Sequence, residues 1–307
     1  MLDRYRLWAQ AQGYSPKTVS HVTQSVEMFA RFFGGIPDVK RVSGEDLQRF
    51  IAGLRCRHTW PDYPDRRKRP LAPTSINTYV RAIRAFWGWL EKEGHIPSNP
   101  LSKIKPPKKP RLLPEVYSED QLRTILSAVE RRPRERAIIE LFLDSGMRLS
   151  ELTGLELRDL DLSNLTIRVF GKGGKQREVY LSPVTALHLR DYLAVRPNLQ
   201  AESHLLLKWD GRPLGNACLQ TLLRRIGRCA GLVGPLAPHR LRHTFATLSL
   251  RNGANLEYLR LALGHADIKT TSESYLAVSN RDVASAHRRF SPMANLRPPG
   301  RRRAGVD

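Results

Sequence analysis

One stretch of the sequence gathers basic side chains where they could hold an anion. Residues 238–247 read PHRLRHTFAT, and His239 and Arg242 are three positions apart, so they share one face of a helix. Pro238 suits the first turn of that helix, and two histidines and two arginines at a helix N-terminus form an anion site. A guanidinium group donates to phosphate through two parallel hydrogen bonds, so the chemistry indicated is the binding of a phosphoryl group. A basic helix packed on the surface would show the same residues.

Two other stretches place a basic residue at a turn. Arg148 lies in residues 145–152, SGMRLSEL, where a glycine follows a helical run and Glu151 comes one helical turn after the arginine. Lys172 lies in residues 171–175, GKGGK, between two strand-like runs. Each is ordinarily a solvated surface residue. The second stretch lacks the GxxxxGK[ST] spacing and leads into a strand rather than a helix, which excludes a Walker-type phosphate loop.

The order of these stretches is more specific than any one of them. After HxxRH come LGH at residues 263–265 and then Tyr275, ten residues beyond His265. An arginine in GMRLSEL, a lysine in a hairpin GKG, HxxRH, LGH and a tyrosine, in that order, resemble the tyrosine recombinase (phage integrase) family over roughly residues 115–290. Many members space the last histidine and the tyrosine by nine residues, but both spacings occur in the family.

The resemblance implies DNA breaking and rejoining with Tyr275 as the nucleophile. The tyrosine would attack the scissile phosphate and form a 3′-phosphotyrosine, while Lys172 would protonate the leaving 5′-oxygen. The phosphotyrosine conserves the energy of the broken bond, so religation would need no ATP. Neither a metal ion nor any other cofactor is implied, because cationic side chains would surround the phosphate instead.

The same resemblance implies roles for the other matching residues. Arg148 and Arg242 would hold the non-bridging oxygens and stabilise the charge of the pentacoordinate transition state. His239 would help accept the tyrosine proton, and His265 would donate a further hydrogen bond. Glu151 would orient the arginines rather than react, although helix stabilisation alone would also explain it.

The charge of the whole chain favours a nucleic acid as its partner. The 307 residues include 51 lysines and arginines against 29 aspartates and glutamates, which gives a formal net charge of +22. Such an excess raises the local concentration of polyanions, although a basic protein that binds anions incidentally is the alternative. Together with the resemblance, the charge predicts double-stranded DNA as the substrate.

Residues 101–114 are predicted to be a linker that also contacts DNA. Prolines prevent regular structure there, and every charged side chain in the segment is positive. A solvated spacer explains the prolines, whereas a strap along a phosphate backbone explains the charges as well. The DNA contacts predicted in this linker and in the hairpin are Lys103, Lys105, Lys108, Lys109, Arg111, Lys175 and Arg177.

Apolar residues at helical spacing predict a helical first block over residues 1–100. Ser15 and Pro16 suit the start of one helix, another starts near Gly44, and a third starts at 73–76 and stops at Gly94. This block resembles the helical, SAM-like core-binding domain of the same family, though less distinctively than the second block resembles the catalytic domain.

The second block, residues 115–290, is predicted to be helical with one β-hairpin. Residues 118–121, SEDQ, form a capping box, and a later helix ends near Gly146. Runs at 165–170 and 177–181 flank GKGGK as two strands of a hairpin. We therefore expect a mostly helical α+β protein whose two domains clamp DNA, followed by a basic tail at 291–307.

The sequence also predicts a cytoplasmic protein with no membrane partner. Cys56, Cys218 and Cys229 show no CxxC spacing, which argues against a disulfide framework or structural zinc and fits a reducing compartment. The chain opens into a charged amphipathic pattern rather than an apolar signal segment. No run approaches the ~18 apolar residues that a membrane span requires.

The segment beyond Tyr275 resembles the C-terminal helix that family members dock into a neighbouring protomer. Its apolar positions are Val283, Ala286, Phe290 and Met293. The resemblance implies a homo-oligomer, with a dimer on each DNA site and a tetramer when two sites meet in synapsis. A helix folded back on its own domain is the alternative.

Two other functions fit parts of the pattern. A type IB topoisomerase would use the same chemistry without pairing two sites, but the separate N-terminal block and the segment after Tyr275 argue against it. A DNA-binding regulator that has lost catalysis is a second alternative, opposed by the full set of six matching catalytic residues.

The basic insertion at 55–72 favours a mobile-element integrase over a Xer-like resolvase, since it is longer than expected for a Xer protein.

Overall fold

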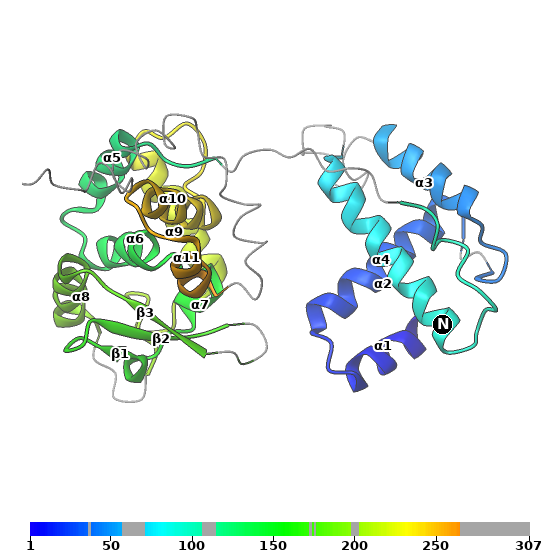
Figure 1. Ribbon diagram of the computed structural model, residues 1–307, viewed down its shortest axis with the longest axis horizontal. Helices are drawn as coiled ribbons and strands as arrows, with labels where there is room; N and C mark the ends of the chain where they lie inside the picture. Colours follow the sequence, from blue (N-terminus) through cyan, green and yellow to red (C-terminus); the bar gives the residue numbers. More distant parts are fainter. Residues whose placement is uncertain are drawn as a thin grey trace, which may run out of the picture. The chain divides into compact units, whose positions relative to one another are not determined.

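Two compact units make up the chain, Met1–Arg111 and Leu112–Asp307 (Figure 1). The computed structural model describes residues 1–35, 38–56, 71–105, 115–171, 174, 176–197 and 203–264. Among the described helices, none is long and apolar enough to cross a membrane.

The N-terminal unit consists of four helices in its described part. They are α1 (Leu2–Ala11), α2 (Pro16–Phe32), α3 (Gly44–Cys56) and α4 (Pro73–Lys92). The predicted start of α2 is confirmed, because the Ser15 side chain accepts a hydrogen bond of 3.2 Å from the Thr18 amide. Helix α4 also begins at Pro73, but its N-cap is Ala72, which supplies no side-chain cap.

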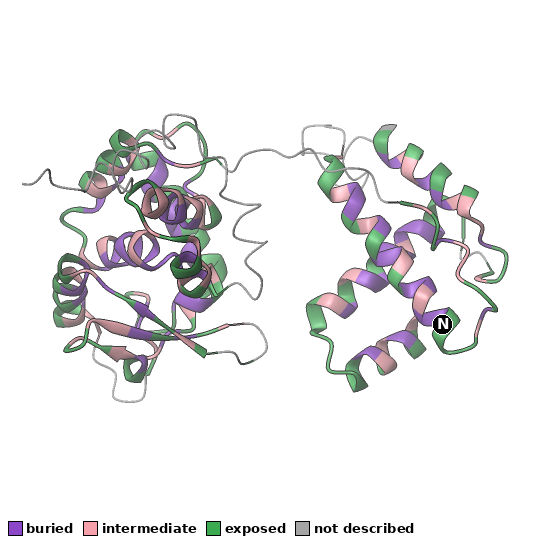
Figure 2. Ribbon diagram, in the orientation of Figure 1, coloured by how far each residue is buried: buried purple, intermediate pink, exposed green. Residues whose placement is uncertain are grey.

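Aromatic rings fill the core of this unit. Helices α2 and α4 pack against each other, and their buried faces meet at the crossing seen in Figure 2. Phe29 lies edge-on to both Phe50 and Trp87, with ring centroids 5.2 and 5.5 Å apart. Such edge-to-face pairs add to the stabilisation that the buried apolar area supplies.

The C-terminal unit contains helices and one small sheet. Its helices are α5 (Glu119–Val129), α6 (Pro133–Ser145), α7 (Leu149–Thr153), the short 3₁₀ helix η1 (Leu157–Asp159), α8 (Pro183–Val195), α9 (Asn216–Cys229), α10 (Pro238–Arg251) and α11 (Leu256–Leu263). The predicted capping box is present at the start of α5, where Ser118 and Gln121 exchange side-chain and backbone hydrogen bonds.

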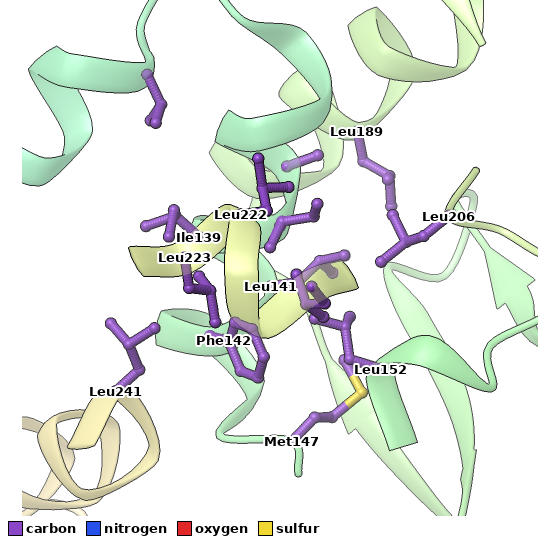
Figure 3. Close-up of a cluster of buried hydrophobic side chains, with 14 of the residues drawn as sticks. Ile139, Leu141, Phe142, Met147, Leu152, Leu189, Leu206, Leu222, Leu223 and Leu241 are labelled. Atoms are coloured by element: carbon purple, nitrogen blue, oxygen red, sulfur yellow. The ribbon is translucent and has the colours of Figure 1, made fainter. Parts of the chain in front are cut away.

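Helix α6 lies at the centre of this unit. Its side chains Ile139, Leu141 and Phe142 are fully buried, and Figure 3 shows them among leucines of α9 and α10. Met147 and Leu152, on either side of Arg148, belong to the same buried cluster. The core therefore anchors the turn that carries Arg148.

The sheet has three antiparallel strands in the order β1-β2-β3. They are β1 (Leu160–Asp161), β2 (Thr166–Phe170) and β3 (Gln176–Tyr180). The predicted hairpin is confirmed: β2 begins one residue later than predicted and ends as predicted, and β3 begins and ends one residue earlier than predicted. The short β1 was not predicted. Together with the helices, the sheet confirms a mostly helical α+β fold.

Candidate active site

A sharp turn at the end of α6 delivers Arg148. Gly146 ends the helix in the left-handed conformation, with φ of 60°, and a Cβ at this position would overlap the Phe245 ring. Glycine meets both requirements because it has no side chain. Met147 is buried, while the Arg148 side chain is 37% exposed, so the turn presents a guanidinium at the protein surface.

Glu151 holds Arg148 in place by two hydrogen bonds. Its Oε2 accepts from the Arg148 backbone N at 2.8 Å, and its Oε1 accepts from Arg148 Nη1 at 2.7 Å. Burial raises the pKa of Glu151, but hydrogen bonds from Arg177 and Arg148 outweigh it and lower the pKa to about 2. The carboxylate therefore stays charged at neutral pH, as an orienting role requires.

Arg177 binds the same carboxylate from strand β3. Its Nη1 and Nη2 donate to the two Glu151 oxygens at 3.1 and 2.8 Å, and its Nε donates to the Ala262 carbonyl at 3.0 Å. The Arg177 side chain is only 12% exposed. All three guanidinium nitrogens of Arg177 therefore donate to protein oxygens, and its contact with DNA stays a prediction.

The strand pattern contained a signal for this placement. Side chains two positions apart point to the same face of a strand, so Arg177 shares the inner face of β3 with the buried Val179. Charge alone groups Arg177 with the lysines of the hairpin, whereas this alternation places it on the inner face.

Arg242 is the second arginine of the site, and it is almost completely buried. Only 5% of it is exposed, and it donates from Nη1 to the Gly146 carbonyl at 2.6 Å and from Nη2 to the Leu263 carbonyl at 2.7 Å. These bonds connect α10 to the Arg148 turn and to the end of α11. Because Leu263 is the first residue of the LGH stretch, the bond from Arg242 to its carbonyl also fixes the position at which this stretch begins.

Two histidines lie one turn apart on α10. His239 is exposed, and His243 is half-buried. Burial lowers the pKa of His243, and the neighbouring His239 and Arg242 lower it further, so that its imidazole is neutral at pH 7. His243 is not among the predicted catalytic residues, although the HxxRH pattern contains it.

Arg240 does not join the anion site that the sequence suggested at the start of α10. Its guanidinium lies 4.1 Å from the Tyr117 ring centroid and donates to the Val116 carbonyl at 3.1 Å. The Tyr117 amide in turn donates to Thr244 Oγ1 at 2.9 Å. Arg240 therefore fixes the beginning of the C-terminal unit against α10.

Several predicted residues lie outside the described part of the chain. Among the predicted catalytic residues these are Lys172, His265 and Tyr275, and among the predicted DNA contacts they are Lys108, Lys109, Arg111 and Lys175. Lys103 and Lys105 are exposed in the N-terminal unit, where they line a groove of about 530 Å³ together with Arg55. The structure thus brings together Arg148, Glu151 and Arg242, with His239 on the same helix as Arg242.

The C-terminal unit matches a known protein family. Residues 115–281, more than half of the chain, match the model of the phage integrase family. The matched range begins one residue before Val116, whose carbonyl Arg240 binds, and it extends past the LGH stretch. It therefore contains Arg148, Glu151 and Arg242.

Curated relatives cover nearly the whole chain. A tyrosine recombinase XerC of Lactobacillus delbrueckii subsp. bulgaricus is 31% identical over 293 residues, which cover 92% of this chain and 95% of the relative. A tyrosine recombinase XerD of Halalkalibacterium halodurans is 35% identical over 294 residues, covering 92% of this chain and 94% of the relative.

Solved structures share the fold at lower identity. The Tn1549 transposon integrase in complex with transposon right end DNA has a TM-score of 0.72 at 18% identity, covering 94% of this chain and 99% of that one. XerH recombinase bound to its difH substrate has a TM-score of 0.69 at 22% identity, covering 94% and 84%. The arginine–glutamate site, the family match and the relatives lead to one conclusion: the chain belongs to the phage integrase family of tyrosine recombinases.

Proposed function

We propose that this recombinase cuts and rejoins double-stranded DNA at a specific site through a 3′-phosphotyrosine on Tyr275, without metal or ATP. The observation that carries the proposal is the pair of arginines, Arg148 and Arg242, fixed around the Gly146 turn by Glu151 and by two backbone carbonyls. Fixed cationic donors of this kind stabilise charge that develops on a phosphoryl group.

The proposed chemistry combines these two arginines with the nucleophile and the general acid that the family resemblance implies. The Tyr275 oxygen attacks phosphorus as its proton passes to a base, for which His239 and the neutral His243 on α10 are the candidates. The bond from phosphorus to the 5′-oxygen breaks, and Lys172 gives that oxygen its proton. Arg148 and Arg242 hold the non-bridging oxygens throughout. Religation reverses each step with a 5′-hydroxyl from the partner strand.

DNA binding is the second part of the proposal. The net charge of +22 supports it, as does the structure of a lambda integrase dimer bound to a core site, which has a TM-score of 0.69 to this chain. The N-terminal helical unit and the linker would grip the duplex beside the catalytic unit. A dimer would occupy each site and a tetramer would form in synapsis.

The linker can be tested by the salt dependence of binding. Replacing Lys105, Lys108 and Lys109 by glutamine should weaken DNA binding and reduce the slope of log K against log salt by about one unit per lost phosphate contact. Glutamine at the exposed Lys40, outside the linker, serves as the control. An unchanged slope in the triple variant would leave the linker as a spacer only.

Adducts trapped in cells test the whole function. Cells expressing the protein are denatured rapidly, and protein-linked DNA is isolated and sequenced beside the Tyr275→Phe variant. The proposal expects adducts at one defined sequence with the wild type only, and the position of that sequence distinguishes a mobile element from a chromosomal site. Binding without adducts would favour a regulator, and adducts scattered without sequence preference would favour a topoisomerase.

A further inference from the structure

We propose that Arg177 is a positioning residue for DNA cleavage, which sets the orientation of Arg148 through their shared partner Glu151. The inference rests on the proposed function, because it concerns the rate of the cleavage step. It also replaces the DNA contact predicted for Arg177 from its charge and its place in the hairpin.

The geometry of the shared carboxylate carries the argument. Both Glu151 oxygens accept from Arg177, at 3.1 and 2.8 Å, and each also accepts one bond from Arg148. The side chain of Glu151 is 3% exposed, so these cations, rather than water, determine its orientation. A substitution of Arg177 is therefore expected to move the two Glu151 oxygens that accept hydrogen bonds from Arg148.

Exposure separates the two arginines. The Arg148 side chain is 37% exposed, whereas that of Arg177 is 12% exposed and donates from all three of its guanidinium nitrogens to Glu151 or Ala262. An Arg–carboxylate fork with two parallel bonds fixes direction as well as distance, which suits a supporting role. Burying a carboxylate beside only one cation would be costly, so Arg177 also keeps Glu151 ionised.

A second contact ties Arg177 to the end of α11. Its Nε donates to the Ala262 carbonyl at 3.0 Å, and a Cβ built on Gly264 would lie 3.1 Å from Arg177 Cδ. The glycine therefore allows the chain to pass close over the arginine just before His265. Arg177 thus connects β3, the α7 carboxylate and the segment that leads to the LGH histidine.

The test measures cleavage in single turnover at saturating DNA, on a duplex carrying the site mapped in cells. Arg177→Met is compared with Arg168→Met, which changes an exposed arginine of the same sheet. A misplacement of about 1 Å can lower a rate about 100-fold, so we expect a loss of that order in Arg177→Met, with DNA affinity and salt slope unchanged. Arg168→Met should cleave like the wild type.

A sulfur-substituted substrate shows which step Arg177 supports. When the bridging 5′-oxygen is replaced by sulfur, the leaving group needs no proton. The Lys172→Ala variant should recover on this substrate, whereas Arg177→Met should remain slow by the same factor, because Arg148 acts on the non-bridging oxygens. Recovery of Arg177→Met on the sulfur substrate would overturn the inference.

Variants of Glu151 provide a further test, which distinguishes a positioning role of Arg177 from a merely structural one. Arg177→Met and Glu151→Gln should be non-additive, and Arg177→Lys should restore part of the rate. The ratio of the Arg177→Met rate to the wild-type rate should also fall as the pH is lowered, because without Arg177 the Glu151 carboxyl loses part of what lowers its pKa and takes up a proton at a higher pH than in the wild type. Additive losses with no change in the pH profile would contradict the inference.

Two outcomes separate this inference from the function beneath it. Weaker DNA binding with a reduced salt slope and an unchanged saturated rate would make Arg177 a DNA contact and leave the proposed function standing. A wild-type protein that forms no adduct on the mapped duplex would overturn both proposals.

Discussion

The two units bury different kinds of polar side chain. In the described part of the N-terminal unit the buried polar residues are neutral, namely Thr23, Ser25 and Asn77. The C-terminal unit buries charged residues as well, namely Arg134, Glu135, Glu140, Glu151, Asp159 and Arg242. Both units have extensive apolar cores, so the difference is not one of core formation.

Two of these buried charged residues, Glu151 and Arg242, belong to the candidate active site. A buried charge destabilises a fold unless it is paired, and Glu151 and Arg242 are paired within the site itself. The described part of the N-terminal unit has no buried charged residue that would need such a partner. The comparison predicts that the two units respond differently to packing defects, strain and acid.

The largest effect is expected from the aromatic core. Trp87 is 1% exposed, so Trp87→Ala should lower the free energy of unfolding of the N-terminal unit by about 4 kcal/mol. Amide hydrogen exchange of the full chain reports each unit separately. Protection should fall in α2 and α4 and stay unchanged in α6. An equal fall in α6 would mean that the units do not unfold independently.

A smaller loss should follow Gly146→Ala in the C-terminal unit. The substitution adds backbone strain at positive φ to a clash with Phe245, together about 3 kcal/mol. Gly231, whose φ is also positive at 67° but which has open space around its Cβ, is the matched control at about 1 kcal/mol. Urea unfolding measures both. Similar losses for the two variants would show that the Phe245 contact is unimportant.

Acid should affect the C-terminal unit selectively. Because the pKa of Glu151 is lowered from 4.5 to about 2, its contribution is complete above pH 4.5 and is lost as pH falls toward 2. By linkage, about 2 kcal/mol should disappear between pH 6 and pH 3. Glu151→Gln should remove this pH dependence, as measured by exchange in α6 and α7. The same acid loss in the variant would assign it to another carboxyl.

The smallest effect is expected where the units are alike. Arg49 pairs with Glu45 on α3 and Arg123 with Glu119 on α5, in both cases with exposed partners one turn apart. Such pairs are screened by water, so Arg49→Gln and Arg123→Gln should each change stability by less than about 0.5 kcal/mol. Thermal unfolding would show this, and a larger change in either would mean that surface charge also distinguishes the units.

The sequence predicted local features of the fold and missed distant ones. The cap at Ser15, the capping box at Ser118 and the stop at Gly146 depend on neighbouring residues, and the structure contains all three. The bonds from Arg177 to Glu151 and from Arg242 to Gly146 join residues 26 and 96 positions apart. Such contacts depend on how elements pack, and neither spacing nor charge indicates them.

The same limit applies to the DNA contact that was predicted for Arg177. A positive residue beside a hairpin of lysines suggests a phosphate contact, and only the position of Val179 on the same strand face argues for the interior. The order of motifs along the chain predicted the family, because that order does not depend on knowing which side chains touch.

The residue that becomes linked to DNA tests the central claim most directly. The wild-type protein is trapped on a duplex carrying its mapped site, the DNA is digested to a short remnant, and the protein is cleaved into peptides for mass spectrometry. The account predicts that the remnant is attached to the peptide containing Tyr275, by a bond to the tyrosine oxygen. A remnant on another residue, such as the half-exposed Tyr258 of α11, would contradict it.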